Sequence, residues 1–268
     1  MWSLVGHFLE IKIKKIMKLE EKIKKKYLYT SNNNLFKYLY FFIQKIKSKK
    51  KFQKSYSGYT AQDLIVDYFF RNKKKGSYID VGCYHPFIGN NTYRLHKRGW
   101  SGINIDLDFH TIDFFNHCRK TDDNINIGVS DKKGQQNLYF VHNRSAINSL
   151  DSRREKGAKE IKKINVDTLD NIISSSNYNG KKIDFISIDV EGYELKVLSG
   201  FDLKKHAPDL VLIEYIDLKM NKIEFHNQDI NHILNSELYN YMLENNYSLV
   251  NWLHSDLVFI SNNCRDKL

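Results

Sequence analysis

The sequence of 268 residues has two prolines, three cysteines and no long apolar run. Two prolines exclude a proline-rich or collagen-like chain. The cysteines include no Cys-x-x-Cys pair, so we expect reduced thiols rather than a disulfide framework or a four-ligand zinc site. The longest apolar runs, Met1–Leu9 and Tyr38–Gln44, fall far short of the roughly 20 residues that span a bilayer. Lysines follow the first run, the reverse of a secretory signal. These absences predict a soluble, cytoplasmic protein.

Glycine-rich phosphate-binding motifs are also missing from the sequence. A nicotinamide-dinucleotide fingerprint, G-x-G-x-x-G, places backbone N–H groups against a pyrophosphate. Here Gly82 is followed by Cys83 and Tyr84, and the next glycine is Gly89. The P-loop pattern G-x-x-x-x-G-K-[ST] does not occur either. The sequence is therefore not expected to form a site for a phosphate chain.

Positive charge is concentrated in the first 54 residues. This segment holds 15 lysines and three glutamates, a net charge of +12. Of the 42 basic and 31 acidic residues of the whole chain, the remainder keeps 27 and 28, so its net charge is −1. We therefore expect two parts, a lysine-rich extension over residues 1–54 and a charge-balanced domain over residues 55–268.

Apolar residues in the extension recur at helical spacing on both sides of a Ser-Asn-Asn-Asn break: Leu9, Ile13, Ile16, Ile23 and Tyr27 before it, and Leu35, Leu39, Phe42, Ile43 and Ile46 after it. The spacing predicts two amphipathic helices with lysine-rich polar faces. Three roles stay open for them. In the first, the helices lie on an anionic membrane surface, which would place the protein at the inner face of the membrane. In the second they bind nucleic acid, and in the third they dock on the protein's own domain.

In the domain, short β-rich runs alternate with helical periodicity. We expect helices over 60–71 (capped by Thr60), 91–98, 109–119, 169–174, 194–198 and 230–245. We expect strands over 77–81, 101–107, 124–129, 136–141, 164–166, 183–190 and 210–215, and a closing hairpin of 247–253 and 256–260. Apolar strands joined by helices predict a mostly parallel sheet covered on both faces, with the antiparallel hairpin at one edge.

Acidic residues stand at the carboxyl ends of most of the expected strands, at Asp80, Asp106, Asp131, Asp189 with Glu191, and Glu214. In open α/β sheets, ligands bind beyond these strand ends, where the strand order reverses. Ionised groups without partners are costly at buried strand ends. Acids at several ends therefore indicate one shared ligand.

Asp106 and Gly82 indicate what kind of ligand this is. An acid at the second strand end can accept hydrogen bonds from both hydroxyls of a ribose. Gly82 lets a ligand approach the backbone closely, because it has no side chain. Since no phosphate loop is present, these residues favour a nucleoside that carries a cationic tail. S-adenosylmethionine is such a molecule.

Five motifs follow one another along the domain: YIDVGCYHP at 78–86, NTY at 91–93, RGWSGINID at 98–106, VDTLD at 166–170 and DFISIDVEGYELKVL at 184–198. In order and spacing they resemble the FkbM family of S-adenosylmethionine-dependent methyltransferases. The resemblance covers about residues 56–261. Cys83 and Tyr84 stand where relatives often carry small residues or asparagine, and residues 1–54 have no counterpart in the family core.

The resemblance implies a seven-stranded, Rossmann-like class I methyltransferase sheet. It also implies a set of residues around the cofactor S-adenosylmethionine: Asp80 and Gly82 beside the methionine moiety, Asp106 on the ribose, Gly128, Val129 and Ser130 around the adenine, and Asp189 with Glu191 facing the sulfonium and the acceptor. Cys83 belongs to the same cofactor-binding set. Family members mostly methylate hydroxyl groups of sugars or polyketide-type molecules. The implied acceptor is therefore a sugar, a glycan or a related small molecule, including a lipid-linked sugar.

A hydroxyl group is a weak nucleophile, so a positioned base should contribute about 10²–10⁴-fold to its methylation. His85, in the loop after the first strand, is the first candidate, and its alternative is a loop histidine bonded to the backbone. Asp189, with Glu191 beside it, is the second candidate, and its alternative is to position the acceptor or the donor's ammonium group. A divalent cation held by Asp189, Glu191 and Glu214 is chemically allowed. The spacing does not require it, and no metal is expected.

Two other functions deserve comparison. A nucleic-acid methyltransferase could grip phosphates with the lysine-rich extension, but the [DN]-P-P-[YF] motif that places a flipped base is absent and the domain has no basic excess. A non-catalytic scaffold at a membrane surface could reuse a methyltransferase fold. The intact acidic residues at the strand ends argue against that loss of activity.

Overall fold

The computed structural model describes residues 19–29, 34–52, 57–215 and 229–266. The chain divides into two compact units, Met1–Ser55 and Tyr56–Leu268, which are treated separately below. Among the described residues, no helix is long and apolar enough to cross a bilayer.

The described part of the first unit consists of two helices, residues 19–29 and α2 (Asn34–Phe52). Aromatic rings join them. Tyr27 stacks on Tyr40 with ring centroids 5.5 Å apart, and it meets Phe41 edge-on at the same distance. Residues 1–18, which include most of the first predicted helix, lie outside the described residues.

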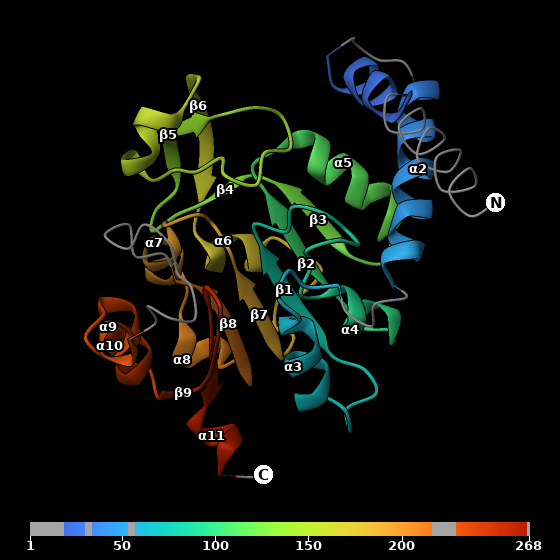
Figure 1. The fold of residues 1–268 in the computed structure, drawn as a ribbon. Helices are drawn as coiled ribbons and strands as arrows, with labels where there is room; N and C mark the ends of the chain where they lie inside the picture. The colour runs from blue at the N-terminus through green and yellow to red at the C-terminus, as the bar shows by residue number, and fades with distance from the viewer. Residues whose placement is uncertain (1–18, 30–33, 53–56, 216–228, 267–268) are drawn as a thin grey trace, which may run out of the picture. The chain divides into compact units, whose positions relative to one another are not determined.

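The described residues of the second unit form a seven-stranded sheet (Figure 1). Its strands are β1 (Ser77–Val81), β2 (Ser101–Asp106), β3 (Asp123–Asn126), β7 (Phe185–Ile188), β8 (Leu210–Glu214), β9 (Tyr247–Leu253) and β10 (Asp256–Ser261). They lie in the order β3-β2-β1-β7-β8-β10-β9. The first five are parallel, and β10 runs antiparallel to both β8 and β9. The mostly parallel sheet with a C-terminal hairpin is therefore confirmed.

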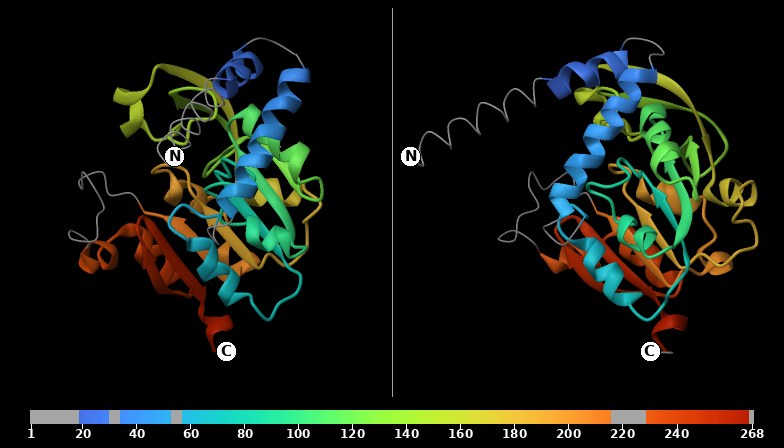
Figure 2. Two further views of the ribbon diagram at one scale, coloured as in Figure 1. Left: turned by 45° about the vertical axis from the view of Figure 1, so that its right-hand side comes forward. Right: turned by 90° about the vertical axis from the view of Figure 1, so that its right-hand side faces the viewer.

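Helices cover both faces of this sheet, as Figures 1 and 2 show. They are α3 (Gln62–Phe69), α4 (Tyr93–Lys97), α5 (Phe109–Cys118), α6 (Leu169–Ser174), α7 (Glu194–Ser199), α8 (Leu203–His206), α9 (Ile230–Leu234), α10 (Glu237–Glu244) and α11 (Asn262–Arg265). The larger buried cluster joins one face of the sheet to α6, α7, α8 and α10, and the smaller cluster joins the other face to α3 and α4.

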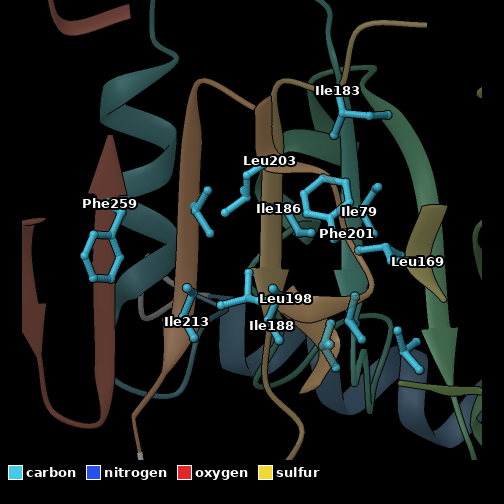
Figure 3. Close-up of a cluster of buried hydrophobic side chains, with 14 of the residues drawn as sticks. Ile79, Leu169, Ile183, Ile186, Ile188, Leu198, Phe201, Leu203, Ile213 and Phe259 are labelled. Carbon is cyan, nitrogen blue, oxygen red and sulfur yellow. The ribbon is translucent and has the colours of Figure 1, made fainter. Parts of the chain in front are cut away.

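The two clusters follow from the alternation of side chains along each strand. In β1, Ile79 and Val81 belong to the larger cluster, whereas Tyr78 belongs to the smaller one. Ile186 of β7 lies in the larger cluster and its neighbour Phe185 in the smaller. Figure 3 shows the larger cluster, in which strand isoleucines pack against side chains such as Leu198.

A second, three-stranded sheet has the order β4-β6-β5, with β4 (Gly128–Val129), β5 (Gly134–Phe140) and β6 (Glu160–Asp167). The prediction of one strand over residues 124–129 was therefore wrong. The pairing with β2 ends at Asn126, and Gly128 then pairs with Val166 of the other sheet. A Cβ atom on Gly128 would lie 2.8 Å from Cγ1 of Val166, so the glycine permits this close change of partner.

Two expected helix ends also differ. The segment 230–245 forms two helices instead of one, because the Ser236 side chain accepts a hydrogen bond from the Tyr239 N–H and begins a new helix. Thr60 does not cap α3. The capping position is Ala61, which has a left-handed backbone (φ 71°), and the Thr60 N–H instead donates to the Gln62 side chain.

A fully buried arginine braces the loop that follows β1. Arg119 donates hydrogen bonds to Thr92 Oγ1 at 2.7 Å, to Asn90 Oδ1 at 2.6 Å and to the Pro86 carbonyl oxygen at 2.8 Å. Its charge also opposes the rise in pKa that burial causes at the Asp80 carboxyl. The arginine therefore fixes residues 86–92 beneath the carboxyl end of the sheet.

We expect Arg119→Met to lower the free energy of unfolding by about 3–5 kcal/mol, because it leaves a buried carboxylate and several acceptors without their partner. Arg71→Met is the matched control. Arg71 is exposed, so its loss should change stability by about 0.5 kcal/mol or less. Urea unfolding followed by circular dichroism measures both variants, and equal stabilities would contradict this role of Arg119.

Candidate active site

A cavity of about 450 Å³ lies in the second unit at the carboxyl ends of the parallel strands. Its volume is within the usual range of small-molecule sites, about 300–1,000 Å³. Six of the residues expected at the site line it: Gly82, Asp106, Gly128, Val129, Asp189 and Glu191. The structure therefore brings together the ends of β1, β2, β4 and β7.

Gly82 allows the ends of β1 and β7 to meet. Its φ is +78°, and a Cβ atom there would lie only 1.7 Å from the carbonyl oxygen of Asp189. Two lining residues nearby, Tyr84 (φ 50°) and Glu191 (φ 60°), also have left-handed backbones, which is uncommon outside glycine. Both strands therefore end in tight, constrained turns that face the same cavity.

We expect Gly82→Ala to destabilise the protein by several kcal/mol and to abolish ligand binding, since the new methyl group would force the two strand ends apart. Gly89→Ala is the control. Gly89 has a similar φ of +61° and also lines the cavity, but a Cβ there would meet nothing within 4 Å. Its cost should be about 1–2 kcal/mol. Thermal unfolding compares the two, and equal losses would contradict the close approach.

Asp106 presents its carboxylate at the end of β2. Oδ1 accepts the Asp108 N–H at 2.8 Å and Oδ2 accepts the Tyr84 N–H at 3.0 Å. Burial raises the pKa of this carboxyl to about 7, against these two stabilising hydrogen bonds. Each oxygen keeps a second lone pair, so the group can accept two further hydrogen bonds from a ligand.

Asp189, Glu191 and Glu214 bring carboxylate oxygens within 4.8 Å of one another. Burial and the charges of neighbouring acids, Asp256 first among them, raise the pKa of Asp189 well above its ordinary value. Burial and the charges of Asp189, Glu191 and Glu194 raise the pKa of Glu214 to about 11, and a side-chain hydrogen bond with Asp189 acts in the same direction. We interpret the pair as a neutral Glu214 donating to the Asp189 carboxylate, so that the pair carries one negative charge.

Glu191 lines the cavity beside Asp189 and Glu214, and the three side chains form an acidic wall. Its Oε2 pairs with Arg154 Nη2 at 2.5 Å, and the arginine opposes the rise in pKa that burial causes. Arg154 comes from the 3₁₀ helix η1 (Ser152–Gly157), in the connection between β5 and β6. Three carboxylates this close also match the oxygen ligands of a hard divalent cation, so the alternative raised by the sequence keeps its geometric basis.

Asp80 and Ser130 were expected beside the cofactor, but neither lines the cavity. The Asp80 carboxylate accepts hydrogen bonds at 2.9 Å from Asn90 Nδ2 and Thr92 Oγ1. Ser130 is fully buried, and its Oγ accepts a hydrogen bond from Gln136 Nε2 at 2.7 Å. The Asp80 carboxylate thus holds residues 90–92, and Ser130 is bonded to β5.

Cys83 and His85 are also absent from the cavity lining. The Cys83 side chain is buried in a small apolar cluster with α5. His85 is 5% exposed, and its Nδ1 accepts the backbone N–H groups of Phe87 and Ile88, each at 3.1 Å. Its ring packs edge-on against Phe114 at 5.2 Å. This is the backbone-bonded alternative for His85.

Several residues that line the cavity were not expected there: Gln62, Tyr84, Ala146, Asn148, Leu150, Tyr193, His254 and Asp256. Gln62 and Asp256 are hydrogen-bonded to each other, although 194 positions separate them. Tyr193 donates to Gln136 Oε1 at 2.6 Å and so ties the cavity wall to β5. Only Tyr84 and Tyr193 stand inside motifs, so motif membership is the one signal that pointed toward them.

The strand order β3-β2-β1-β7-β8 is that of doubly wound nucleotide-binding sheets, and the cavity lies at the carboxyl ends of β1 and β7, where this order reverses. The fold is a Rossmann-like α/β sheet with an acidic cavity at the carboxyl ends of its parallel strands. The family model described as "Methyltransferase FkbM domain" matches residues 80–249, more than half of the chain. The chain belongs to the FkbM methyltransferase family.

Among the curated proteins, none matches this sequence. The solved structures that match include one titled "Crystal structure of monomeric WbdD", which is 13% identical with a TM-score of 0.36. The alignment covers 75% of this chain and 40% of the WbdD chain, so the present chain spans less than half of that length.

Proposed function

We propose that the protein is an S-adenosylmethionine-dependent O-methyltransferase that acts on a hydroxyl group of a sugar, a glycan or a related small molecule, including a lipid-linked sugar. The observation that carries the proposal is the convergence of Asp106, Asp189 and Glu191 on one cavity. Membership of the methyltransferase family supports the reaction class. An acceptor that presents a hydroxyl group suits the acidic wall around Asp189 best, because a carboxylate there can accept the hydroxyl proton.

The donor fits the residues present in the cavity. Asp106 has two free lone pairs for ribose hydroxyls, and Gly82 lines the same cavity. Gly128 and Val129 would lie along the adenine. The carboxylates of Asp189 and Glu191 suit a positive sulfonium, because opposite charges attract strongly in a site with little water.

In the proposed mechanism, the cavity walls hold the acceptor hydroxyl in line with the donor, which can supply about 7–11 kcal/mol of the barrier. The bound donor contributes a methyl carbon whose bond to sulfur breaks as the acceptor oxygen bonds to it. Asp189 accepts the hydroxyl proton, and neutral Glu214 keeps its carboxylate oriented by hydrogen bonding. Glu191, paired with Arg154, closes the wall beside it.

A methyl-transfer assay with the full chain tests the proposal. The purified protein is incubated with S-adenosylmethionine and a panel of free, nucleotide-linked and lipid-linked sugars. Mass spectrometry should then detect S-adenosylhomocysteine and an acceptor heavier by one methyl group. A parallel reaction with chelator tests the cation alternative. Methylation of RNA or DNA, with no sugar product, would replace the proposed acceptor class.

A further inference from the structure

The connection between β5 and β6 forms part of the cavity wall. Its residues 141–157, called the strap below, include η1 and contribute four of the lining residues: Ser145, Ala146, Asn148 and Leu150. Asn148 holds the strap together, because its Oδ1 accepts the Val141 N–H at 2.8 Å and its Nδ2 donates to the His142 carbonyl oxygen at 2.9 Å. The strap is therefore an ordered part of the wall with hydrogen bonds of its own.

One end of the strap is anchored beside the end of β2. The Arg144 N–H donates to Asp108 Oδ2 at 2.5 Å, and the Arg144 guanidinium lies over the Phe114 ring, 5.3 Å from its centroid. The other oxygen of Asp108 accepts backbone N–H groups at the start of α5. This anchor joins the strap to the turn that follows Asp106.

The other end of the strap is anchored on the turn that follows β7. Ser149 Oγ donates to the Glu191 carbonyl oxygen and Arg153 Nη2 donates to the Gly192 carbonyl oxygen, each at 3.1 Å. Arg154 Nη2 pairs with Glu191 Oε2. The strap packs closely on this turn, since a Cβ atom on Gly192 would lie 2.7 Å from a carboxylate oxygen of the strap.

The two anchors lie on either side of β1, because the strand order is β2-β1-β7. Neighbouring strands are about 4.8 Å apart, so the strap spans about 10 Å across the end of β1. Asp106, Gly82 and Asp189 line the cavity at these three strand ends, where the donor is proposed to bind. The strap therefore borders the proposed donor site from one anchor to the other.

Arg154 makes the contact that ties the strap most directly to the site. Its partner Glu191 lines the cavity. The Arg154 side chain is 27% exposed and that of Glu191 is 15% exposed, so salt and water screen their attraction less than they screen a surface pair. Arg153, the other arginine of this anchor, is 54% exposed and bonds to a carbonyl oxygen of the turn.

We infer that Arg154 is a positioning residue, which holds the strap against the donor site by pairing with Glu191 and so slows the release of the donor. The inference rests on the proposed function for the identity of the ligand. The hold on the strap is a property of the unliganded protein, so it is measured without any ligand.

Hydrogen exchange of the unliganded full chain tests this hold. Several strap amides donate hydrogen bonds, among them those of Val141 and Arg144, so their exchange reports the opening of the strap. In R154Q, exchange over residues 141–154 should become about tenfold faster, because a hydrogen bond between charged groups contributes about that factor or more. R154K keeps the positive charge and should recover part of the protection.

Release of S-adenosylhomocysteine tests the consequence for the ligand. Tritiated S-adenosylhomocysteine is bound to the full chain, chased with unlabelled compound and followed by rapid filtration. Release should be about tenfold faster from R154Q than from the wild type, and intermediate in R154K. If the wild type does not bind S-adenosylhomocysteine, the proposed function fails, while the exchange experiment still decides whether Arg154 holds the strap.

K156Q is the matched control, because Lys156 is an exposed residue of the same η1 and its loss removes the same charge. Its strap exchange should equal that of the wild type. E191Q takes the charge from the partner and should itself speed strap exchange, so it keeps the test decisive if circular dichroism shows that R154Q does not fold. Adding R154Q to E191Q should change strap exchange little.

Three results would overturn the inference. The first is strap exchange at the wild-type rate in R154Q and E191Q. The second is an equal increase in K156Q. The third is an increase on adding R154Q to E191Q as large as in the wild type, which would show that Arg154 acts through another contact.

Discussion

Replacing Asp189 by asparagine is expected to lower the rate of methyl transfer by about 10²–10⁴-fold, because the acceptor hydroxyl would lose its base. Asparagine keeps the size of the side chain and can still accept a hydrogen bond, so donor affinity should fall much less. Burial and the nearby acids raise the pKa of Asp189, so the wild-type rate should increase with pH as this carboxyl loses its proton. The measurement is single-turnover kinetics at saturating donor over a range of pH.

Glu214→Gln is the control for Asp189. With a pKa of about 11, Glu214 is neutral near pH 7, and glutamine closely resembles this neutral acid in shape. It can also donate a hydrogen bond to Asp189, so the rate should fall by about tenfold or less. A normal single-turnover rate in D189N, combined with a large loss of donor affinity, would show that Asp189 binds the donor and is not the base.

Donor affinity should depend on pH through Asp106. Burial raises the pKa of this carboxyl to about 7, so it is neutral well below that pH and ionised well above it. The ionised form is the stronger acceptor for ribose hydroxyls, and hydrogen bonds to a charged group contribute about 1.5–3 kcal/mol. Asp106→Ala should therefore weaken donor binding about 10–100-fold at pH 8, and wild-type binding should be weaker at pH 6 than at pH 8.

The same raised pKa gives a stability test for Asp106. Its folded-state pKa lies above its ordinary value, so the unliganded protein loses stability as pH rises from about 4 to about 7. D106N should remove this part of the pH dependence and should also flatten the pH dependence of donor affinity. Calorimetric titrations and thermal scans of D106N measure both. A variant with wild-type affinity at pH 8 would remove Asp106 from the ribose site.

The order of strands and helices could be predicted because each strand is an apolar run of the right length with a clear break. Ile79, Ile103 and Ile186 show the physical reason, since a strand buried on both faces must be apolar throughout. The strand ends were predictable for the same reason, and with them the convergence of Gly82, Asp106 and Asp189. The break between β3 and β4 could not be predicted. The chain stops pairing with β2 at Asn126 and pairs with β6 from Gly128, and the new partner, Val166, is 38 positions further along the sequence.

Side-chain direction explains why some of the expected site residues do not line the cavity. Strand alternation in β1 puts Asp80 on the same face of the sheet as Tyr78, where its carboxylate accepts hydrogen bonds from Asn90 and Thr92. Strand alternation alone could have shown this. For His85 no such rule exists, because Tyr84 before it has a left-handed backbone that the sequence did not indicate. The pairing of Gln62 with Asp256 depends on how β10 inserts beside β8, which only the folded sheet determines.

The central claim is that one nucleoside donor binds where the strand ends meet. Hydrogen exchange of the full chain, with and without S-adenosylhomocysteine, tests it most directly. We expect slower exchange at the amides of residues 82–91, 106–108, 127–129 and 189–193, which carry the lining residues at those ends. Binding without protection in these four segments, or no binding at all, would contradict the account.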